Sequence, residues 1–136
     1  MSSLKTISIL FRTTNTFKTL MTPLIESSGL TLSQFSVLEF LYHHDQKPVG
    51  VIAKKILIPN SSLSYVIEHL IKMGYVQKTQ SNQDQRSYLI GLTKAGKKKI
   101  KTLFPKHEAL LKERLDRLDA QEEKTLQTLL KKISLP

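Results

Sequence analysis

The chain has 136 residues, of which 40% are hydrophobic, with no cysteine and a formal net charge of +10 at pH 7. This length suits one domain with a real core. The lack of cysteine excludes disulfides and cysteine-based redox sensing, and it suits a reducing cytoplasm. No apolar run approaches the roughly 20 residues that span a bilayer, and the N-terminal segment does not resemble a secretory signal. We therefore expect a cytoplasmic protein without a membrane segment.

The positive charge is concentrated in one part of the chain. Residues 47–101 hold 11 Lys/Arg and 2 Asp/Glu, whereas residues 1–46 hold 3 of each and residues 102–136 hold 7 and 6. Such a segment favours a polyanionic partner, because neutralising phosphates releases counterions. A solvated lysine-rich face is the alternative interpretation.

The N-terminal third of the chain is predicted to be helical. Apolar residues recur at a helical period over residues 4–25, and Ser27-Ser28-Gly29 is a typical stop. Pro23 lies near the end of this helix, where it can produce a kink. Thr31 suits the N-cap of a second helix, and Gln34 completes a capping box. The second helix is predicted to bury Phe35, Leu38, Leu41 and Tyr42.

Two more helices are expected at the start of the basic segment. A short helix over residues 49–57, buried through Ile52, Ala53 and Ile56, follows an extended connection at residues 47–49. A turn at residues 58–60 leads to a fourth helix, which Asn60 or Ser61 caps and Gly74 stops. The fourth helix is amphipathic. It is predicted to bury Leu63, Val66, Ile67, Leu70 and Ile71, and to expose Ser61, Ser62, Ser64, Tyr65, Glu68, His69 and Lys72.

A strand–loop–strand unit follows this amphipathic helix. Residues 75–80 suit a strand, residues 81–85 have turn chemistry, and residues 86–92 alternate, with Tyr88, Ile90 and Leu92 on one face. Helix, strand, polar loop and strand in this order are what a winged helix-turn-helix needs. One helix would enter the DNA major groove, and a basic hairpin would lie beside it.

The rest of the chain is predicted to form two helices. Thr93 caps a long fifth helix, in which Pro105 should produce a kink or a split into two. Asp119 and Glu122 form another capping box, before the last helix. That helix presents Leu126, Leu129, Leu130 and Ile133 on one stripe. The stripe, like the apolar face of residues 7–25, suits a partner helix, although packing within one monomer would also explain it.

Two patterns in the basic segment resemble those of the MarR family of winged-helix regulators. The first, Leu-x-x-x-Gly-hydrophobic-Val, occupies residues 70–76. The second, Asp-x-Arg followed by a strand and Leu-Thr-x-x-Gly, occupies residues 84–86 and 92–96. Their order and spacing make the resemblance specific, and it covers nearly the whole chain. The departures are Lys78 where Arg is frequent, residues 57–59 where the turn often contains Gly, and serines and a tyrosine where Thr and Arg are common.

The resemblance implies a mainly α fold with a small β-hairpin wing. A winged helix-turn-helix would occupy residues 30–101, and N- and C-terminal dimerisation helices would occupy residues 1–28 and 102–136. The implied function is a homodimeric transcriptional regulator, expected to be a repressor. It would bind a pseudo-palindromic site in double-stranded DNA.

The expected DNA contacts fall into three groups. Base edges would be read by Ser61, Ser62, Ser64, Tyr65 and His69 on the fourth helix. Phosphates would be contacted by Lys54, Lys55, Lys72, Lys78 and Lys94. Arg86 at the hairpin tip suits a narrow minor groove, and Asp84 can hold its guanidinium or cap the loop. A solvated polar surface is the alternative for each group, and some of Lys97, Lys98, Lys99 and Lys101 are expected only to add solubility.

Many members of the family bind a small aromatic or phenolic effector between their dimerisation and DNA-binding parts, and the resemblance implies such a pocket here. Its expected lining is Phe11, Arg12, Phe17, Phe35 and Phe40. Each phenylalanine suits the hydrophobic core at least as well. Arg12 stands out because it can pair with an effector's carboxylate.

Catalysis and metal binding are not indicated. No nucleophile stands at a recognisable spacing from a base, and there is no Gly-rich phosphate loop or metal triad. His43, His44, His69 and His107 lack the i, i+4 spacing of a metal-binding helix face, so we expect no metal or cofactor. Two other functions compete with gene regulation. One is a winged helix that docks an acidic protein partner and binds DNA only non-specifically, and the other is RNA binding, for which the usual aromatic strand platform is missing.

Overall fold

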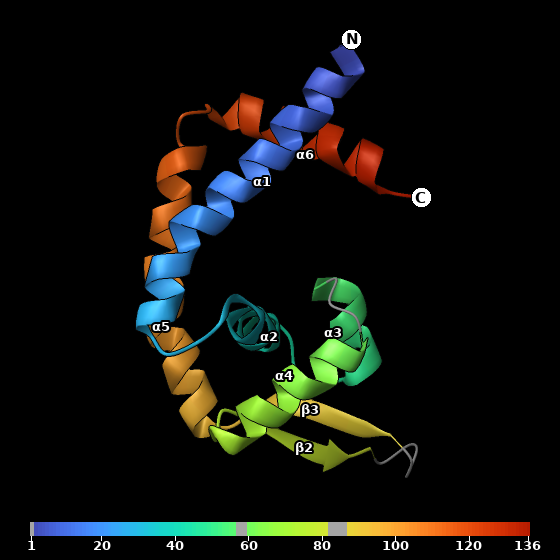
Figure 1. The fold of residues 1–136 in the computed structure, drawn as a ribbon, viewed down its shortest axis with the longest axis vertical. Helices are drawn as coiled ribbons and strands as arrows, with labels where there is room; N and C mark the ends of the chain where they lie inside the picture. Colours follow the sequence, from blue (N-terminus) through green and yellow to red (C-terminus); the bar gives the residue numbers. More distant parts are fainter. Residues whose placement is uncertain (1, 57–59, 82–86) are drawn as a thin grey trace. The chain divides into compact units, whose positions relative to one another are not determined.

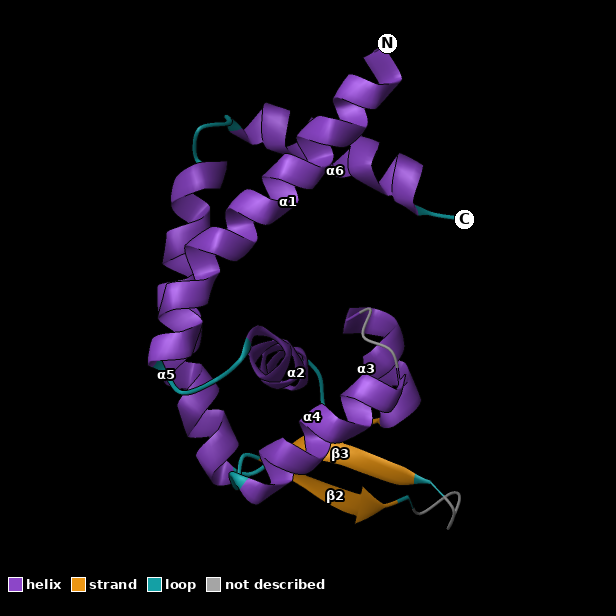
Figure 2. Ribbon diagram, viewed as in Figure 1, coloured by secondary structure: helices purple, strands orange, loops and turns teal. Residues whose placement is uncertain are grey.

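The computed structural model describes residues 2–56, 60–81 and 87–136, with the side chains of residues 4–56, 62–81 and 87–136. The chain divides into two compact units, one formed by residues 22–106 and the other by residues 1–21 and 107–136. Helices make up most of both units (Figure 1, Figure 2). None of the described helices combines the length and apolar character that crossing a membrane requires.

The unit of residues 22–106 contains three short helices, α2 (Leu32–His43), α3 (Val49–Ile56) and α4 (Asn60–Lys72). The predicted capping box begins α2: Thr31 Oγ1 accepts from the Gln34 amide at 3.2 Å, and Gln34 Oε1 accepts from the Thr31 amide at 2.9 Å. Gly74 lies in the turn after α4 and has φ +82°. Residues with a side chain rarely adopt this conformation.

A three-stranded antiparallel sheet completes this fold, with strand order β1-β3-β2. The hairpin pairs β2 (Val76–Gln80) with β3 (Tyr88–Leu92), so that Val76 lies opposite Leu92 and Gln80 opposite Tyr88. The predicted extended connection proves to be a two-residue strand, β1 (Lys47–Pro48), which pairs with β3 at Ile90 and Leu89. In Figure 2 the hairpin lies beside α4.

The core of this unit is formed by side chains from α2, α3, α4, the sheet and the following helix. Its fully buried members include Phe35, Val37, Leu38, Ile52, Leu63, Ile67, Leu70, Ile90 and Ile100. The prediction for Tyr42 is wrong, because this side chain is exposed and lies against Phe104 and His43. Val37, which the periodicity did not single out, is buried in its place.

The long helix α5 (Lys94–Leu115) begins directly after β3, the last strand of the hairpin. Thr93 Oγ1 accepts from the Gly96 amide at 3.0 Å, as expected of an N-cap, and also donates to the Gly74 carbonyl. A Cβ at Gly96 would overlap the Tyr75 carbonyl oxygen. The Leu-Thr-x-x-Gly pattern therefore places the first turn of α5 directly on the turn that follows α4.

The other unit consists of the first part of α1 (Ser2–Ser27), the second part of α5 and α6 (Ala120–Ser134). Pro105 does not split α5, which continues as one helix to Leu115. The predicted capping box at the start of α6 is present, with Asp119 Oδ1 accepting from the Glu122 amide at 2.8 Å. Lys112 of α5 pairs with Asp116, the residue that follows the helix, and this hydrogen bond raises the pKa of Lys112.

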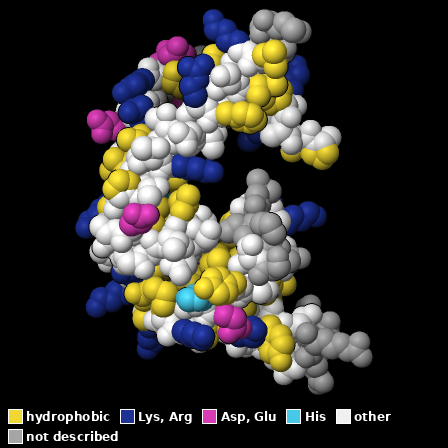
Figure 3. Space-filling model, viewed as in Figure 1, with side chains coloured by type: hydrophobic (Ala, Val, Ile, Leu, Met, Phe, Trp, Pro, Cys, Tyr) yellow, Lys and Arg dark blue, Asp and Glu magenta, His cyan; other side chains and the backbone are white. Residues whose placement is uncertain are grey.

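Large apolar side chains are exposed on the helices of this second unit. They include Leu4, Ile7 and Phe11 of α1 and Leu126, Leu129, Leu130 and Ile133 of α6. Figure 3 shows hydrophobic side chains gathered on the surface of this unit. The predicted apolar stripe of α6 is therefore not covered within the described part of one chain.

Candidate nucleic-acid interface

The exposed face of α4 is polar over residues 62–72, whose side chains the structure describes. Leu63, Ile67 and Leu70 anchor the opposite face in the core, each no more than 2% exposed. Ser62, Ser64, Tyr65, Glu68 and Lys72 are exposed. This division follows the helical period, so burying one face presents the other as a continuous set of hydrogen-bonding side chains.

The rings of Tyr65 and His69 form a tilted pair on this face, with 49° between their planes. Tyr65 is 67% exposed, and its ring centroid lies 4.5 Å from that of His69, one turn later. Tyr65 therefore leaves a hydroxyl group and much of its ring accessible to a partner. Both are groups that can contact base edges in a major groove.

Glu68 connects the candidate recognition helix to the hairpin. Its carboxylate lies 3.6 Å from the Lys78 ammonium of β2, which also lies 5.3 Å from the Tyr88 ring of β3. Lys78 was predicted to contact phosphate, but its charge is shared with a carboxylate and an aromatic face. The role of Glu68 was not foreseen. Glu68 is one of only two acidic residues in residues 47–101. An acidic residue in so basic a segment could have indicated an ion pair.

The remaining predicted phosphate contacts differ in their surroundings. Lys54, Lys72 and Lys94 are exposed, at the ends of α3 and α4 and the start of α5. Lys55 is also exposed, but it lines a hollow together with Glu39 and Phe40 of α2 and His44, the C-cap of that helix.

Three predicted site residues lie outside the described residues or side chains. These are Asp84 and Arg86, which were predicted at the hairpin tip, and the side chain of Ser61. The capping by Asn60 or Ser61 and the turn before α4 fall there too.

The five residues predicted to line an effector pocket lie in different environments. Phe11 and Arg12 are exposed on α1, where Arg12 donates to Ser8 Oγ at 3.3 Å, and Phe17 is half-buried. Phe35 is a core residue at 1% exposure, and Phe40 stacks on His44.

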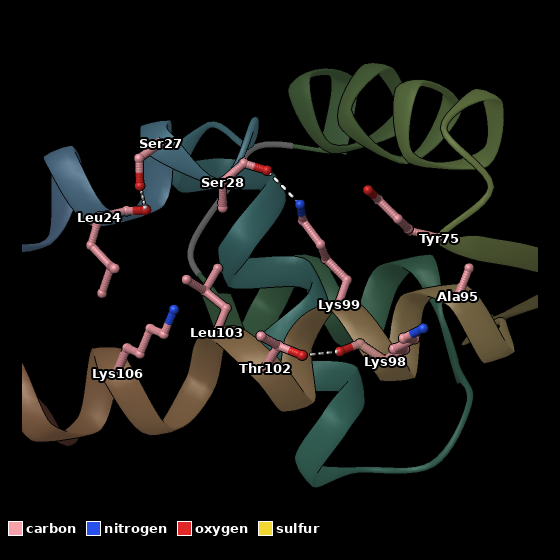
Figure 4. Close-up of a pocket in the computed structure, with 10 residues that line it drawn as sticks. All are labelled: Leu24, Ser27, Ser28, Tyr75, Ala95, Lys98, Lys99, Thr102, Leu103 and Lys106. Carbon is pink, nitrogen blue, oxygen red and sulfur yellow. Dashed lines mark hydrogen bonds between the residues drawn. The ribbon is translucent and has the colours of Figure 1, made fainter.

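A cavity of about 430 Å³ is lined by ten other residues: Leu24, Ser27, Ser28, Tyr75, Ala95, Lys98, Lys99, Thr102, Leu103 and Lys106 (Figure 4). It lies within the unit of residues 22–106, between the end of α1, the turn after α4 and α5. The sequence did not predict it because its walls come from three separate parts of the chain, at residues 24–28, 75 and 95–106.

Metal-binding geometry is not seen in the part of the chain that the structure describes. No three histidine, aspartate or glutamate side chains come together there as a cluster able to hold a metal ion.

A helix-turn-helix followed by an antiparallel hairpin, with a polar and basic exposed face, defines the class of winged-helix DNA-binding proteins. The comparisons with known proteins agree. The MarR family model matches residues 30–88. The HTH-type transcriptional regulator MhqR of Bacillus subtilis is 30% identical over 133 residues, which are 98% of this chain and 92% of MhqR. The chain belongs to the MarR family and is a DNA-binding transcription regulator rather than an enzyme.

Solved structures show the same fold. A mutant form of MarR from E. coli, in complex with operator DNA, superposes with a TM-score of 0.83 at 23% identity, covering 95% of this chain and 92% of that one. Bordetella bronchiseptica BpsR, whose DNA binding is regulated by 6-hydroxynicotinic acid, superposes with a TM-score of 0.84 at 24% identity, covering 96% and 98%. The mainly helical winged-helix fold with terminal helices is thus confirmed.

Proposed function

We propose that the protein is a cytoplasmic, homodimeric repressor that binds a two-fold symmetric operator through α4. The observation that carries this proposal is the polar face of α4, which is exposed while its other face is fixed in the core by Leu63, Ile67 and Leu70. A repressor needs only to occupy a promoter, and this surface is suited to occupancy.

We assign base contacts to the N-terminal half of α4, because that end of a recognition helix enters the groove in helix-turn-helix proteins. Ser62, Ser64 and Tyr65 lie there, together with Ser61. None of them can grip a base with two parallel hydrogen bonds, as Arg or Asn does. A large share of the selectivity is therefore expected to come from phosphate contacts and DNA shape.

The dimer is assigned to the terminal helices, whose exposed apolar side chains need a partner. Leu4, Phe11, Leu129 and Ile133 are each more than half exposed in the single chain. A second copy offers an identical apolar surface, and a two-fold dimer carries two recognition helices about one DNA turn apart.

A small organic effector is proposed to release the repressor. Regulation of DNA binding by an aromatic acid in BpsR, a protein of the same fold, supports this part of the proposal. Release requires only that the effector binds better to a conformation whose two recognition helices do not match both half-sites.

The proposed function is tested by measuring affinity for the DNA upstream of the protein's own gene against shuffled duplex, at two salt concentrations. A sequence-specific repressor of its own operon should bind the upstream DNA at least about 10³-fold more tightly. Equal and steeply salt-dependent binding to both would mean that only the electrostatic attraction operates on these sequences. The basic face would then serve a different DNA target or an acidic protein.

Arg86 provides a separate test of the wing. We expect Arg86→Ala to weaken binding to DNA and leave the unfolding temperature unchanged, because a hairpin-tip arginine contributes to a groove contact and not to the core. Gel-shift titration with thermal unfolding as the folding check measures both. Equal affinity in the two proteins would remove the wing from the proposed interface.

A further inference from the structure

The side chains that α4 offers to DNA are hydroxyl groups where arginine or amide groups are common. Residues 61–72 contain no arginine, asparagine or glutamine, the side chains that hold guanine or adenine through two parallel hydrogen bonds. Lys72 can also bind guanine, but it is the last residue of α4, at the end opposite to the one that enters the groove. Direct reading of bases therefore falls to Ser62, Ser64 and Tyr65.

Hydroxyl groups discriminate poorly between bases. A serine or tyrosine hydroxyl can donate or accept, so it can pair with the O4 acceptor of thymine or with the N4 donor of cytosine. The carboxylate of Glu68 would select cytosine, but it lies 3.6 Å from the Lys78 ammonium of β2 and is held there by the opposite charge. The feature that remains is the 5-methyl group, which only thymine presents in the major groove and which needs an apolar contact.

Tyr65 supplies an apolar surface on the face of α4 that is offered to DNA. The other apolar side chains of this helix whose positions are described are buried or half-buried. Tyr65 is 67% exposed, more than any other large hydrophobic side chain described in residues 22–106. Its ring is therefore the group on this face best suited to pack on a methyl group.

His69 supports the ring of Tyr65 from the next turn of the helix. The two ring centroids lie 4.5 Å apart, and His69 is half-buried whereas Tyr65 is exposed. Helical side chains lean toward the N-terminus of their helix, which brings the imidazole to the turn that carries Tyr65. A ring that already has a neighbour on one side loses less conformational freedom when it meets a base.

We propose that Tyr65 selects one thymine in each half-site of the operator by packing its ring on the 5-methyl group of that base. His69 is the positioning residue that keeps the ring within contact distance. This inference rests on the proposed function, since it concerns DNA bound at the exposed face of α4, and it names the base that this face reads. A methyl contact gives a preferred sequence to a helix whose groove end has no side chain that grips a base with two hydrogen bonds.

The test changes one methyl group of the DNA and leaves the protein untouched. Binding sites are selected from randomised duplexes, and the most enriched duplex is synthesised with dU in place of dT, at one symmetric pair of positions at a time. The dU base pairs as dT does and lacks only the 5-methyl group. We expect one pair of positions at which the exchange weakens binding about fifteenfold, because each buried methyl group contributes about fourfold and the two half-sites multiply.

Variants of the full chain then assign the methyl contact to its side chain. The ratio of affinities for the dT and dU duplexes should fall from about fifteen to about one in Tyr65→Ala, whereas Tyr65→Phe keeps the ring and should keep the ratio. His69→Gln keeps a polar side chain but removes the supporting ring, so it should lower the ratio at least about twofold. Thermal unfolding verifies that each variant is folded.

Tyr42→Ala is the matched control. It truncates another exposed tyrosine of the same unit, on α2 and not on α4, and it should leave the ratio at about fifteen. A fall of the ratio in this control equal to that in Tyr65→Ala would show that the methyl effect does not report on α4, and would overturn the proposal.

Three further results would also overturn it. The first is unchanged affinity for every duplex with dU in place of dT. The second is an unchanged ratio in Tyr65→Ala, which would place another side chain on the methyl group. The third is an unchanged ratio in His69→Gln, which would remove the positioning role. A selection without a common motif would overturn the proposed function as well, whereas a clear motif without a methyl effect would remove only the thymine contact.

Discussion

Lysines that look alike in the sequence do different things in the structure. Lys72 is exposed at the end of α4, Lys78 is shared between Glu68 and the Tyr88 ring, and Lys99 is tied to the Ser28 carbonyl. The roles of Lys78 and Lys99 depend on residues in other parts of the chain. An exposed ammonium that keeps its hydration is the best phosphate contact, so Lys72 and Lys54 are stronger candidates than Lys78.

The salt dependence of DNA binding separates these roles. Lys72→Met should weaken binding to all duplexes and lower the slope of log K against log salt by roughly 1 for each phosphate that is no longer neutralised, hence about 2 in a dimer. Lys78→Met should change the slope little, because its charge is already partly neutralised by Glu68. Fluorescence titrations at several salt concentrations measure both slopes.

Glu68→Gln is the matched control for this comparison. Freed from the carboxylate, Lys78 should become available to phosphate, so this variant should bind random duplex more tightly and with a steeper slope. A lower slope in Lys78→Met, equal to that in Lys72→Met, would mean that Lys78 contacts phosphate despite its ion pair.

At the scale of elements, two glycines shape the junction between α4, the hairpin and α5 for different reasons. Gly74 has φ +82° with open space around it, whereas Gly96 packs its backbone against the Tyr75 carbonyl. The first glycine is needed for its backbone conformation and the second for the close approach of two segments.

The two glycines should therefore respond differently to alanine. Gly74→Ala is expected to destabilise the protein by about 1 kcal/mol, the penalty of a left-handed backbone for one residue. Gly96→Ala should destabilise it by about 3 kcal/mol, because its methyl group displaces backbone and not a flexible side chain. Urea unfolding of both variants measures the difference. A Gly96→Ala variant as stable as wild type would contradict the packing described for α5.

Most helices and both long strands could be predicted from periodicity and capping, because those signals are local. The capping boxes at Thr31 and Asp119 were visible for the same reason. The pairing of β1 with β3 could not be predicted, because two residues show no alternation. The continuity of α5 past Pro105 could not be predicted either, since the missing amide removes one hydrogen bond, and the surrounding turns determine whether the helix continues.

At the scale of the whole molecule, the terminal helices and the winged helix are suited to different tasks. The exposed face of α4 is polar, whereas α1 and α6 expose leucine, isoleucine and phenylalanine. The polar face of α4 could be predicted in outline, because the helical period of apolar residues in the sequence separates the buried face from the exposed one. The cavity was not, because Lys99 and Ser28 meet only after the chain has folded.

The proposed dimer is tested on α6. Leu129→Asp should shift the protein from dimer to monomer in sedimentation and weaken operator binding at least about a hundredfold, because the second half-site would no longer be bound intramolecularly. Gln127→Asp adds the same charge to an exposed polar position two residues away and should leave the dimer intact. A dimer that persists in Leu129→Asp would place the interface elsewhere.

Sequence-specific recognition of DNA by a dimer is best examined by selecting binding sites from a library of randomised duplexes. We expect enrichment of a two-fold symmetric motif whose half-sites are centred about one helical turn, roughly 10 base pairs, apart. A selection that ends with no common motif, while binding remains tight at low salt and disappears at high salt, would contradict such recognition.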